Sequence, residues 1–173
     1  MKKLTLLLFL AFASISYGQN DLTLNIGVNM LDDNGETNPF EGISDFYFNL
    51  PISAGLEFQW SEKFTLEQSV TINEFELPSG DELYFSTDTS VKWYWNKHKS
   101  DRDWFDAYLG AGVGFNTVNE DFNTTLNIPL GVRFWIGEKW GARLQSMAKF
   151  AADTDHNSSN NHMVHSFELF FKL

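Results

Sequence analysis

Apolar residues alternate with polar or small residues along most of the chain, with the two-residue period of a β-strand. No stretch after Asp21 has a helical period. The alternating runs measure about nine to fifteen residues, whereas a strand of a soluble protein has about 5–6 and a tilted membrane strand about 9–11. Eight such runs cover residues 22–30, 46–60, 64–72, 83–95, 105–115, 126–136, 140–150 and 163–173.

The connections between these runs alternate in length. Short links at 61–63, 96–103 and 137–139 alternate with longer connections at 31–45, 74–82, 116–124 and 151–162. An even number of strands with short turns at one end and longer loops at the other is typical of barrels in the outer membrane. We therefore predict an all-β fold, an eight-stranded antiparallel up-and-down transmembrane β-barrel, with both termini at the end of the short turns.

The charged residues indicate which face of the predicted strands points inward. The apolar face of the eight runs carries no Asp, Glu, Lys or Arg, whereas the opposite face carries five acids and five bases. Such a balance suits an enclosed lumen, because an unpaired buried charge is costly. Side chains that fill a narrow barrel leave no open pore. The predicted ion-pair network of the lumen comprises Glu57, Glu67, Asp88, Lys92, Asp106, Arg133, Arg143, Lys149, Glu168 and Lys172.

The tryptophans gather at the end of the predicted barrel that has the short turns. A ring of aromatic side chains at one depth is typical of a membrane–water interface. Strand parity predicts that Trp104 and Trp135 point into the lumen and that the others contact lipid. The predicted interface aromatics are Trp60, Trp93, Trp95, Trp104, Trp135 and Trp140.

Two prolines fall inside the predicted strands, where a closed barrel has no edge that tolerates a missing N–H. Pro51 and Pro129 occur in similar contexts, Asn-Leu-Pro-Ile and Asn-Ile-Pro-Leu. We expect a local bulge or an unpaired carbonyl at each. The fourth run is also weaker, since Thr87 and Thr89 lie on its lipid face.

The start of the chain predicts a signal peptide at residues 1–18. Lys2 and Lys3 precede an apolar stretch over 4–13, and the small residues Ser16 and Gly18 stand at the −3 and −1 positions of a cut before Gln19. About ten apolar residues are too few for a spanning helix, which needs about 20. We expect an exported chain whose residues 19–173 form the barrel domain.

Composition and charge exclude several classes of function. The chain has no cysteine, which excludes disulfides, a thiolate metal site and a cysteine nucleophile. Its formal net charge of −11 argues against a nucleic-acid partner, which requires a basic surface. The four longer connections contain thirteen acidic residues and no Lys or Arg, so the excess negative charge gathers at one end of the predicted barrel.

The signal peptide, the eight runs and the ending Phe-Glu-Leu-Phe-Phe-Lys-Leu at 167–173 resemble the OmpA/OmpX-type small outer-membrane barrels. In that family the last strand ends in alternating apolar and aromatic residues that the barrel-assembly machinery reads. The terminal Leu173 departs from the family's terminal aromatic residue. The resemblance implies a monomer in the bacterial outer membrane, surrounded by lipid and lipopolysaccharide. We expect the barrel alone, without the peptidoglycan-binding domain that often follows it.

Residues with a potential for chemistry are few. Asp32, Asp33 and Glu36 offer clustered oxygen ligands for Ca²⁺ or Mg²⁺, and a cation there could bridge to lipopolysaccharide phosphates. His162 and His165 frame the last run, with His165 on the lipid side, but no well-spaced third metal ligand accompanies them. We predict no catalytic residues and no cofactor other than a divalent cation at the acidic loops.

The sequence thus predicts a non-enzymatic outer-membrane barrel with a structural or surface-interaction role. One alternative is a lipid-modifying enzyme, because His156-Asn157-Ser158 resembles the His-x-Ser of lipid A deacylases and Glu168 could supply an acid. Another alternative is a secreted soluble barrel that binds an apolar ligand, as lipocalins do.

Overall fold

The computed structural model describes residues 22–32, 46–77, 80–95, 104–118, 121–153 and 161–173. The predicted signal peptide at 1–18 lies outside these residues. No helix in the described part of the chain is both long and apolar enough to cross a membrane. The strands are β1 (Leu22–Asp32), β2 (Phe46–Tyr47), β3 (Ile52–Gln59), β4 (Phe64–Leu77), β5 (Gly80–Tyr94), β6 (Phe105–Val118), β7 (Asp121–Trp135), β8 (Trp140–Ala151) and β9 (His162–Lys172).

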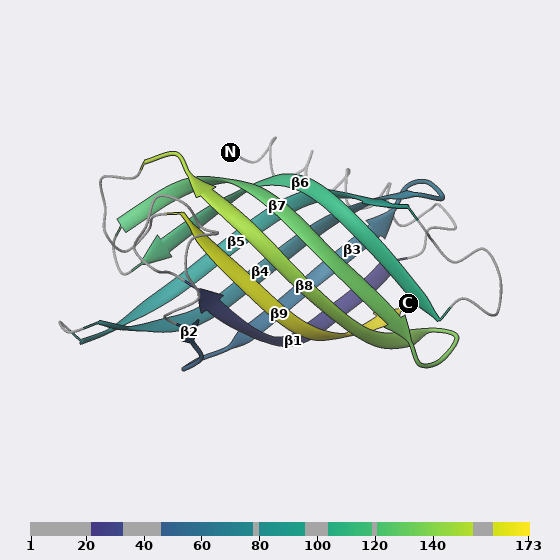
Figure 1. Cartoon of the computed structure of the whole chain (residues 1–173), viewed down its shortest axis with the longest axis horizontal. Coiled ribbons are helices and arrows are strands. Elements are labelled where there is room, and N and C mark those ends of the chain that lie inside the picture. The colour runs from purple at the N-terminus through teal and green to yellow at the C-terminus, as the bar shows by residue number, and fades with distance from the viewer. Residues whose placement is uncertain (1–21, 33–45, 78–79, 96–103, 119–120, 154–160) are drawn as a thin grey trace, which may run out of the picture.

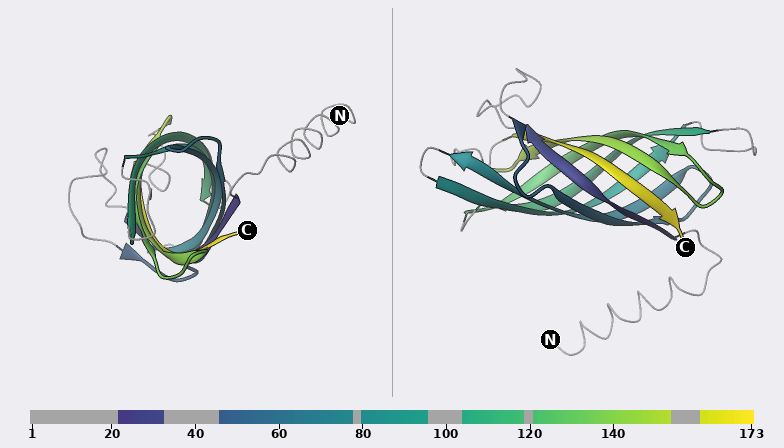
Figure 2. Two further views of the ribbon diagram at one scale, coloured as in Figure 1. Left: turned by 90° about the vertical axis from the view of Figure 1, so that its right-hand side faces the viewer. Right: turned by 90° about the horizontal axis from the view of Figure 1, so that it is seen from below.

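The strands form one antiparallel sheet that closes on itself (Figures 1 and 2). From β3 to β9 each strand pairs with the next in the sequence, and β1 pairs with both β3 and β9. The β1–β9 ladder runs from Thr23 opposite Lys172 to Asp32 opposite Met163. This closure confirms the predicted eight-stranded up-and-down barrel, to which the two-residue strand β2 is a short addition.

The barrel is apolar outside and polar inside, as strand alternation requires. Large apolar side chains on the outer surface are about half exposed, for example Ile26 at 49% and Leu130 at 52%. The buried positions include many polar or charged side chains, such as Asn25, Lys92 and Arg143, each at 0% exposure. This is the inverse of a soluble barrel and matches a wall in contact with lipid.

Two predicted loops are instead continuations of strands. The segment 74–82 was expected to connect two strands, but β4 continues to Leu77 and β5 begins at Gly80. The segment 116–124 is likewise occupied by the ends of β6 and β7, which stop at Val118 and resume at Asp121. These segments were expected to be loops because the apolar alternation stops before them, but strands that extend past the bilayer into water do not need an apolar face there.

The predicted strand over 46–60 is interrupted at Pro51. Its residues divide into β2 and β3, and the segment 48–51 lies between them outside any strand. Proline has no N–H with which to continue the ladder. Asn29 of β1 compensates, since its side-chain amide donates to the carbonyls of Ile52 at 2.7 Å and Ile72 at 2.9 Å. The interruption is therefore sealed by a side chain from the neighbouring strand.

A second asparagine completes this seal. The side-chain amide of Asn73, in β4, donates to the carbonyl of Tyr47 at 3.0 Å and to Oδ1 of Asn29 at 2.8 Å. Its own Oδ1 accepts from the backbone N–H of Asn49 at 3.3 Å. Both asparagines are buried, Asn73 at 0% and Asn29 at 1% exposure. Buried amides with both donors in use are stabilising, so this pair holds the chain where the strand breaks.

At Pro129 the strand continues with a local loss of pairing on one side. Pro129 stays in register with Met147 of β8, while the β6–β7 ladder skips from Leu109–Leu130 to Gly112–Asn127. Gly110 lies where a Cβ atom would come within 2.9 Å of the proline ring. The absence of a side chain at Gly110 thus makes room for Pro129.

Candidate functional site

Six charged side chains fill the half of the lumen nearer the C-terminus, and we call them the inner cluster. They are three acids and three bases: Glu57 of β3, Glu67 of β4, Lys92 of β5, Arg133 of β7, Arg143 of β8 and Glu168 of β9. All are buried, with at most 3% of each residue exposed. Their formal charges sum to zero, as a low-dielectric interior requires.

Glu57 is the acid with the most cationic partners. It lies 2.8 Å from Arg133, 3.4 Å from Arg143 and 3.5 Å from Lys92. The hydroxyl of Tyr94 also donates to its Oε1 at 2.8 Å. These partners come from strands on different sides of the barrel, so this carboxylate ties the wall together across the lumen.

Arg143 has the corresponding position among the bases. Its Nη1 donates to Oε1 of Glu67 at 2.5 Å, and its Nε donates to Oε2 of Glu168 at 2.6 Å. The two carboxylates have further partners, because Asn25 donates to Glu67 at 3.1 Å and Ser53 donates to Glu168 at 2.9 Å. Charge-assisted hydrogen bonds of this kind are about twice as strong as neutral ones.

Aromatic rings occupy the space beside these charges. The guanidinium of Arg133 lies 4.3 Å from the centre of the Tyr94 ring, and Nζ of Lys92 lies 4.5 Å from that of Tyr108. The Tyr108 hydroxyl donates to Oε1 of Gln145 at 2.7 Å. A Cβ atom at Gly131 would come within 2.4 Å of the same hydroxyl, so this glycine leaves room for the ring.

A smaller outer cluster fills the half of the lumen towards the longer connections. It consists of Asp88, Lys149, Tyr84 and His162, all buried. Nζ of Lys149 lies 2.9 Å from Oδ1 of Asp88 and donates to the Tyr84 hydroxyl at 3.1 Å. That hydroxyl also lies 2.8 Å from Nε2 of His162.

An apolar cap lies at the same end of the lumen as the outer cluster. Leu31, Val118 and Val164, together with the ring of Tyr84, form a buried apolar group with at most 3% exposure. Tyr47 of β2 packs against it. This outer end of the barrel is therefore closed by packing as well as by charge.

The structure separates the predicted lumen network into these two clusters and two outlying residues. Asp106 is buried and accepts a hydrogen bond from Nε1 of Trp135 at 2.8 Å. Lys172 lies at the end of β9 and is partly exposed. The other eight predicted residues belong to the inner or the outer cluster.

The prediction for one tryptophan is wrong. Trp104 was expected to point inward, but it is 65% exposed and stacks on Phe134 at 5.7 Å between ring centres. It precedes the first residue of β6, so strand parity does not determine its direction. Trp135 does point inward, since its ring meets that of the buried Phe170 edge-on. The remaining tryptophans, Trp60, Trp93, Trp95 and Trp140, are 42–50% exposed.

Most of the candidate chemistry of the loops lies outside the described residues. This holds for Asp33 and Glu36 of the predicted cation site, and for His156 and Ser158 of the alternative enzymatic site. Asp32 ends β1. Glu168 lies in the inner cluster, bonded to Arg143 and Ser53. Among the residues that the structure describes, no three His, Asp or Glu side chains are grouped so as to hold a metal ion.

Sequence reasoning missed the lumenal tyrosines and the role of His162. Tyr84, Tyr94 and Tyr108 are fully buried and each donates to or accepts from a lumenal side chain. Parity could have identified them, because each stands at an inward position of its alternating run. Their hydroxyls need partners when buried, which the lumen supplies and the lipid does not.

Comparison with known proteins places this fold among small outer-membrane barrels. The N-terminal β-barrel domain of Pseudomonas aeruginosa OprF has a TM-score of 0.61 at 10% identity, over 90% of this chain and 99% of that one. Neisserial surface protein A gives 0.63 at 13% identity, over 90% and 98%. Escherichia coli outer membrane protein W gives 0.53 at 11% identity, over 91% and 100%.

No protein-family model matches the sequence, and no curated protein matches it. At this level of identity the likeness shows the fold alone. The chain is thus similar to OmpA/OmpX-type small barrels in architecture: a closed eight-stranded antiparallel barrel of the kind that spans outer membranes.

Proposed function

We propose that this protein is an integral outer-membrane barrel with a structural or surface-interaction role, closed to ions and without catalytic activity. The observation that carries the proposal is the filled lumen. The inner cluster fills one half of the lumen, the outer cluster and the apolar cap together fill the other half, and the side chains of all three are buried. Ions crossing such a lumen would have to displace paired charges in a low-dielectric interior, which is costly.

The outer surface supports the membrane location. Apolar side chains from every long strand are exposed on it, and a contiguous apolar surface of this extent is not stable in water. Structural neighbours described as outer membrane proteins, from Pseudomonas aeruginosa and Escherichia coli, have the same architecture. The chain would insert there with the help of the barrel-assembly machinery and remain a monomer.

The end with the longer connections supports the surface-interaction role. Acidic residues predominate in the sequence there, and the described ones include Asp32, Asp121 and Asp153. Asn123 and Asp153 hold β7 and the end of β8 together, since the Asp153 N–H donates to Oδ1 of Asn123 at 3.2 Å. Negative charge at this end suits divalent cations that bridge to lipopolysaccharide phosphates.

The test is ion conductance across planar lipid bilayers. We expect no stable channels from the wild type and measurable channels from a Glu57→Ala/Arg143→Ala variant, which removes the two most connected members of the inner cluster. Leu130→Ala on the outer wall is the matched control and should leave the bilayer silent. Wild-type conductance equal to that of the double variant would contradict the closed lumen. Membrane fractionation with heat-dependent mobility on SDS gels tests the location separately.

A further inference from the structure

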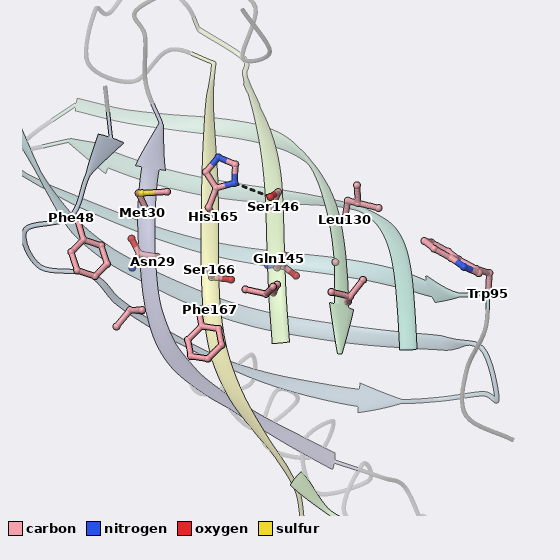
Figure 3. Close-up of a pocket in the computed structure, with 14 residues that line it drawn as sticks. Asn29, Met30, Phe48, Trp95, Leu130, Gln145, Ser146, His165, Ser166 and Phe167 are labelled. Carbon is pink, nitrogen blue, oxygen red and sulfur yellow. Dashed lines mark hydrogen bonds between the residues drawn. The ribbon is translucent and has the colours of Figure 1, made fainter. Parts of the chain in front are cut away.

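A groove of about 670 Å³ crosses the outer wall of the barrel where β7, β8, β9 and β1 lie side by side (Figure 3). Its lining is almost entirely apolar and comes mainly from outward-facing positions on these strands. Phe48, from the segment between β2 and β3, contributes to the same lining. The main apolar residues of the lining are Val28, Met30, Phe48, Leu130, Leu144 and Phe167.

One polar pair stands in this apolar lining, near the end of the groove that faces the longer connections. Ser146 and His165 are directly opposite each other on β8 and β9, and Oγ of Ser146 lies 2.8 Å from Nδ1 of His165 (Figure 3). The imidazole is also flanked by the ring of Phe46, 6.3 Å away and edge-on. In lipid a polar pair is unfavourable unless all its hydrogen-bonding groups find partners, so its place in the wall needs an explanation.

The second ring nitrogen of His165 points towards a carboxylate but does not reach it. Its Nε2 lies 3.9 Å from Oδ2 of Asp32, whereas a hydrogen bond joins such atoms at about 2.7–3.2 Å. With its proton on Nε2, facing this carboxylate, the imidazole would accept a hydrogen bond from the Ser146 hydroxyl at Nδ1. About 30% of the His165 side chain is exposed, and the residue lines the groove.

Another polar side chain on the lipid face, that of Gln68, has hydrogen-bond partners within the protein for both atoms of its amide. Gln68 of β4 donates through Nε2 to Thr87 at 2.8 Å and accepts at Oε1 from Thr89 at 2.5 Å. Its amide therefore has partners on both atoms within the protein. The Ser146–His165 pair differs, because the Nε2 side of the ring lies beyond hydrogen-bond distance of its nearest acid.

We propose that this groove binds an outer-leaflet lipid with a hydroxylated acyl chain, whose hydroxyl hydrogen-bonds to Nε2 of His165. Two atoms 3.9 Å apart can both lie at about 2.8 Å from one oxygen, so a hydroxyl fits between His165 and Asp32. A hydroxyl can accept from the imidazole and donate to the carboxylate. The acyl chain itself would lie on the apolar lining below.

The chemistry of the site favours this occupant. An anionic headgroup would be repelled by Asp32, and a plain acyl chain would leave the imidazole without a partner. A lipid has its polar group at one end of a long apolar body, which matches a groove with its polar pair at one end. The inference rests on the proposed place in the outer membrane, since lipid reaches the groove only there.

The test compares two neutral lipids that differ by one hydroxyl and carry no other: the methyl esters of palmitic acid and of β-hydroxypalmitic acid. Binding to the purified, folded barrel in detergent is measured by native mass spectrometry. We expect the wild type to prefer the hydroxylated lipid by about tenfold, the value of one hydrogen bond. His165→Phe, which keeps a ring in the groove, and Ser146→Ala, which releases the imidazole, should lose this preference. Gln68→Leu, on the same lipid face but outside the groove, should retain it.

Each contrary outcome has a distinct meaning. Equal binding of the two lipids by the wild type, or a preference that survives His165→Phe, would overturn the proposal. Release of free fatty acid by the wild type but not by Ser146→Ala would replace binding with hydrolysis. A dimer that both lipids fail to dissociate would assign the groove to a second copy. Heat-dependent mobility of the same samples on SDS gels shows whether the barrel is folded. A lost lipid preference in a folded barrel contradicts the lipid site alone, whereas absent heat-dependent mobility contradicts the proposed membrane barrel.

Discussion

In the half of the lumen nearer the C-terminus, six charged side chains share six ion pairs. Among the residues that the structure describes, the other half has one buried pair, Asp88–Lys149, and an apolar cap. The members of the inner cluster come from six strands. Each acid there has at least two polar partners, so the loss of one contact leaves others in place. The outer half instead combines a single pair with ordinary hydrophobic packing.

The comparison teaches that a barrel can be filled by two kinds of interaction with different weaknesses. A charge network resists the loss of a contact but not the loss of a charge, because every remaining member is buried. An apolar cap resists charge changes but is sensitive to cavities. Substitutions in the two halves should therefore differ in how far they lower the free energy of unfolding, and in whether a second substitution restores it.

The largest effect is expected from Glu57→Ala. This change leaves Arg133, Lys92 and Arg143 with an uncompensated buried positive charge, which lowers the free energy of unfolding by about 3–5 kcal/mol. Urea unfolding in phospholipid vesicles, followed by tryptophan fluorescence, measures it. Glu57→Gln is the control for lost volume and should be almost as harmful, since charge rather than size is at issue. A loss below about 1 kcal/mol for both variants would show that water or ions enter the inner cluster.

A smaller effect is expected from a cavity in the apolar cap. Leu31 is fully buried at the outer end of the lumen, and Leu31→Ala should lower the free energy of unfolding by about 2–3 kcal/mol. Leu130→Ala, at a position 52% exposed on the outer wall, is the matched control. The same urea experiment should show a clearly smaller loss there. Equal losses would mean that the cap does not pack as a core.

Strand alternation determines which side chains face the lumen and which face lipid. The sequence alone therefore predicts the closed barrel and the direction of most side chains. It does not predict where strands end. The apolar alternation stops before 74–82 and 116–124, which predicted loops there, but β4 to β7 extend into these segments because strands can project past the bilayer into water. The predicted direction of Trp104 is wrong for a related reason: parity applies only inside a strand, and β6 begins one residue later, at Phe105.

The partners within the lumen were beyond sequence reasoning. Alternation places Glu57 and Arg143 inside, but they are 86 residues apart and meet across the barrel. Which inward residues meet depends on the stagger and tilt of the closed sheet, and no local pattern encodes these. The interruption at Pro51 could be anticipated from proline chemistry, yet its seal by Asn29 and Asn73 needs the register of β1 and β4.

The smallest effect, and the sharpest contrast between the two halves, is expected when an ion pair is removed as a whole. Asp88→Asn with Lys149→Met deletes both charges of the outer pair and keeps the hydrogen bond that Asn127 gives to position 88. Replacing a buried pair by groups of similar volume is often neutral, so the double variant should lie within about 1 kcal/mol of the wild type in urea unfolding. Either single change should cost more, because it leaves one buried charge alone.

The matching change in the inner cluster, Glu168→Gln with Arg143→Met, also deletes one acid and one base. It should remain clearly destabilising, because Arg143 also pairs with Glu57 and Glu67: its loss breaks these two further ion pairs and leaves Glu67 with Lys92 as its cationic partner in the cluster. The double-mutant cycles compare the two halves directly. If both double variants regained the same share of the stability that their single variants lose, the inner cluster would be a sum of independent pairs. The two halves would then not differ.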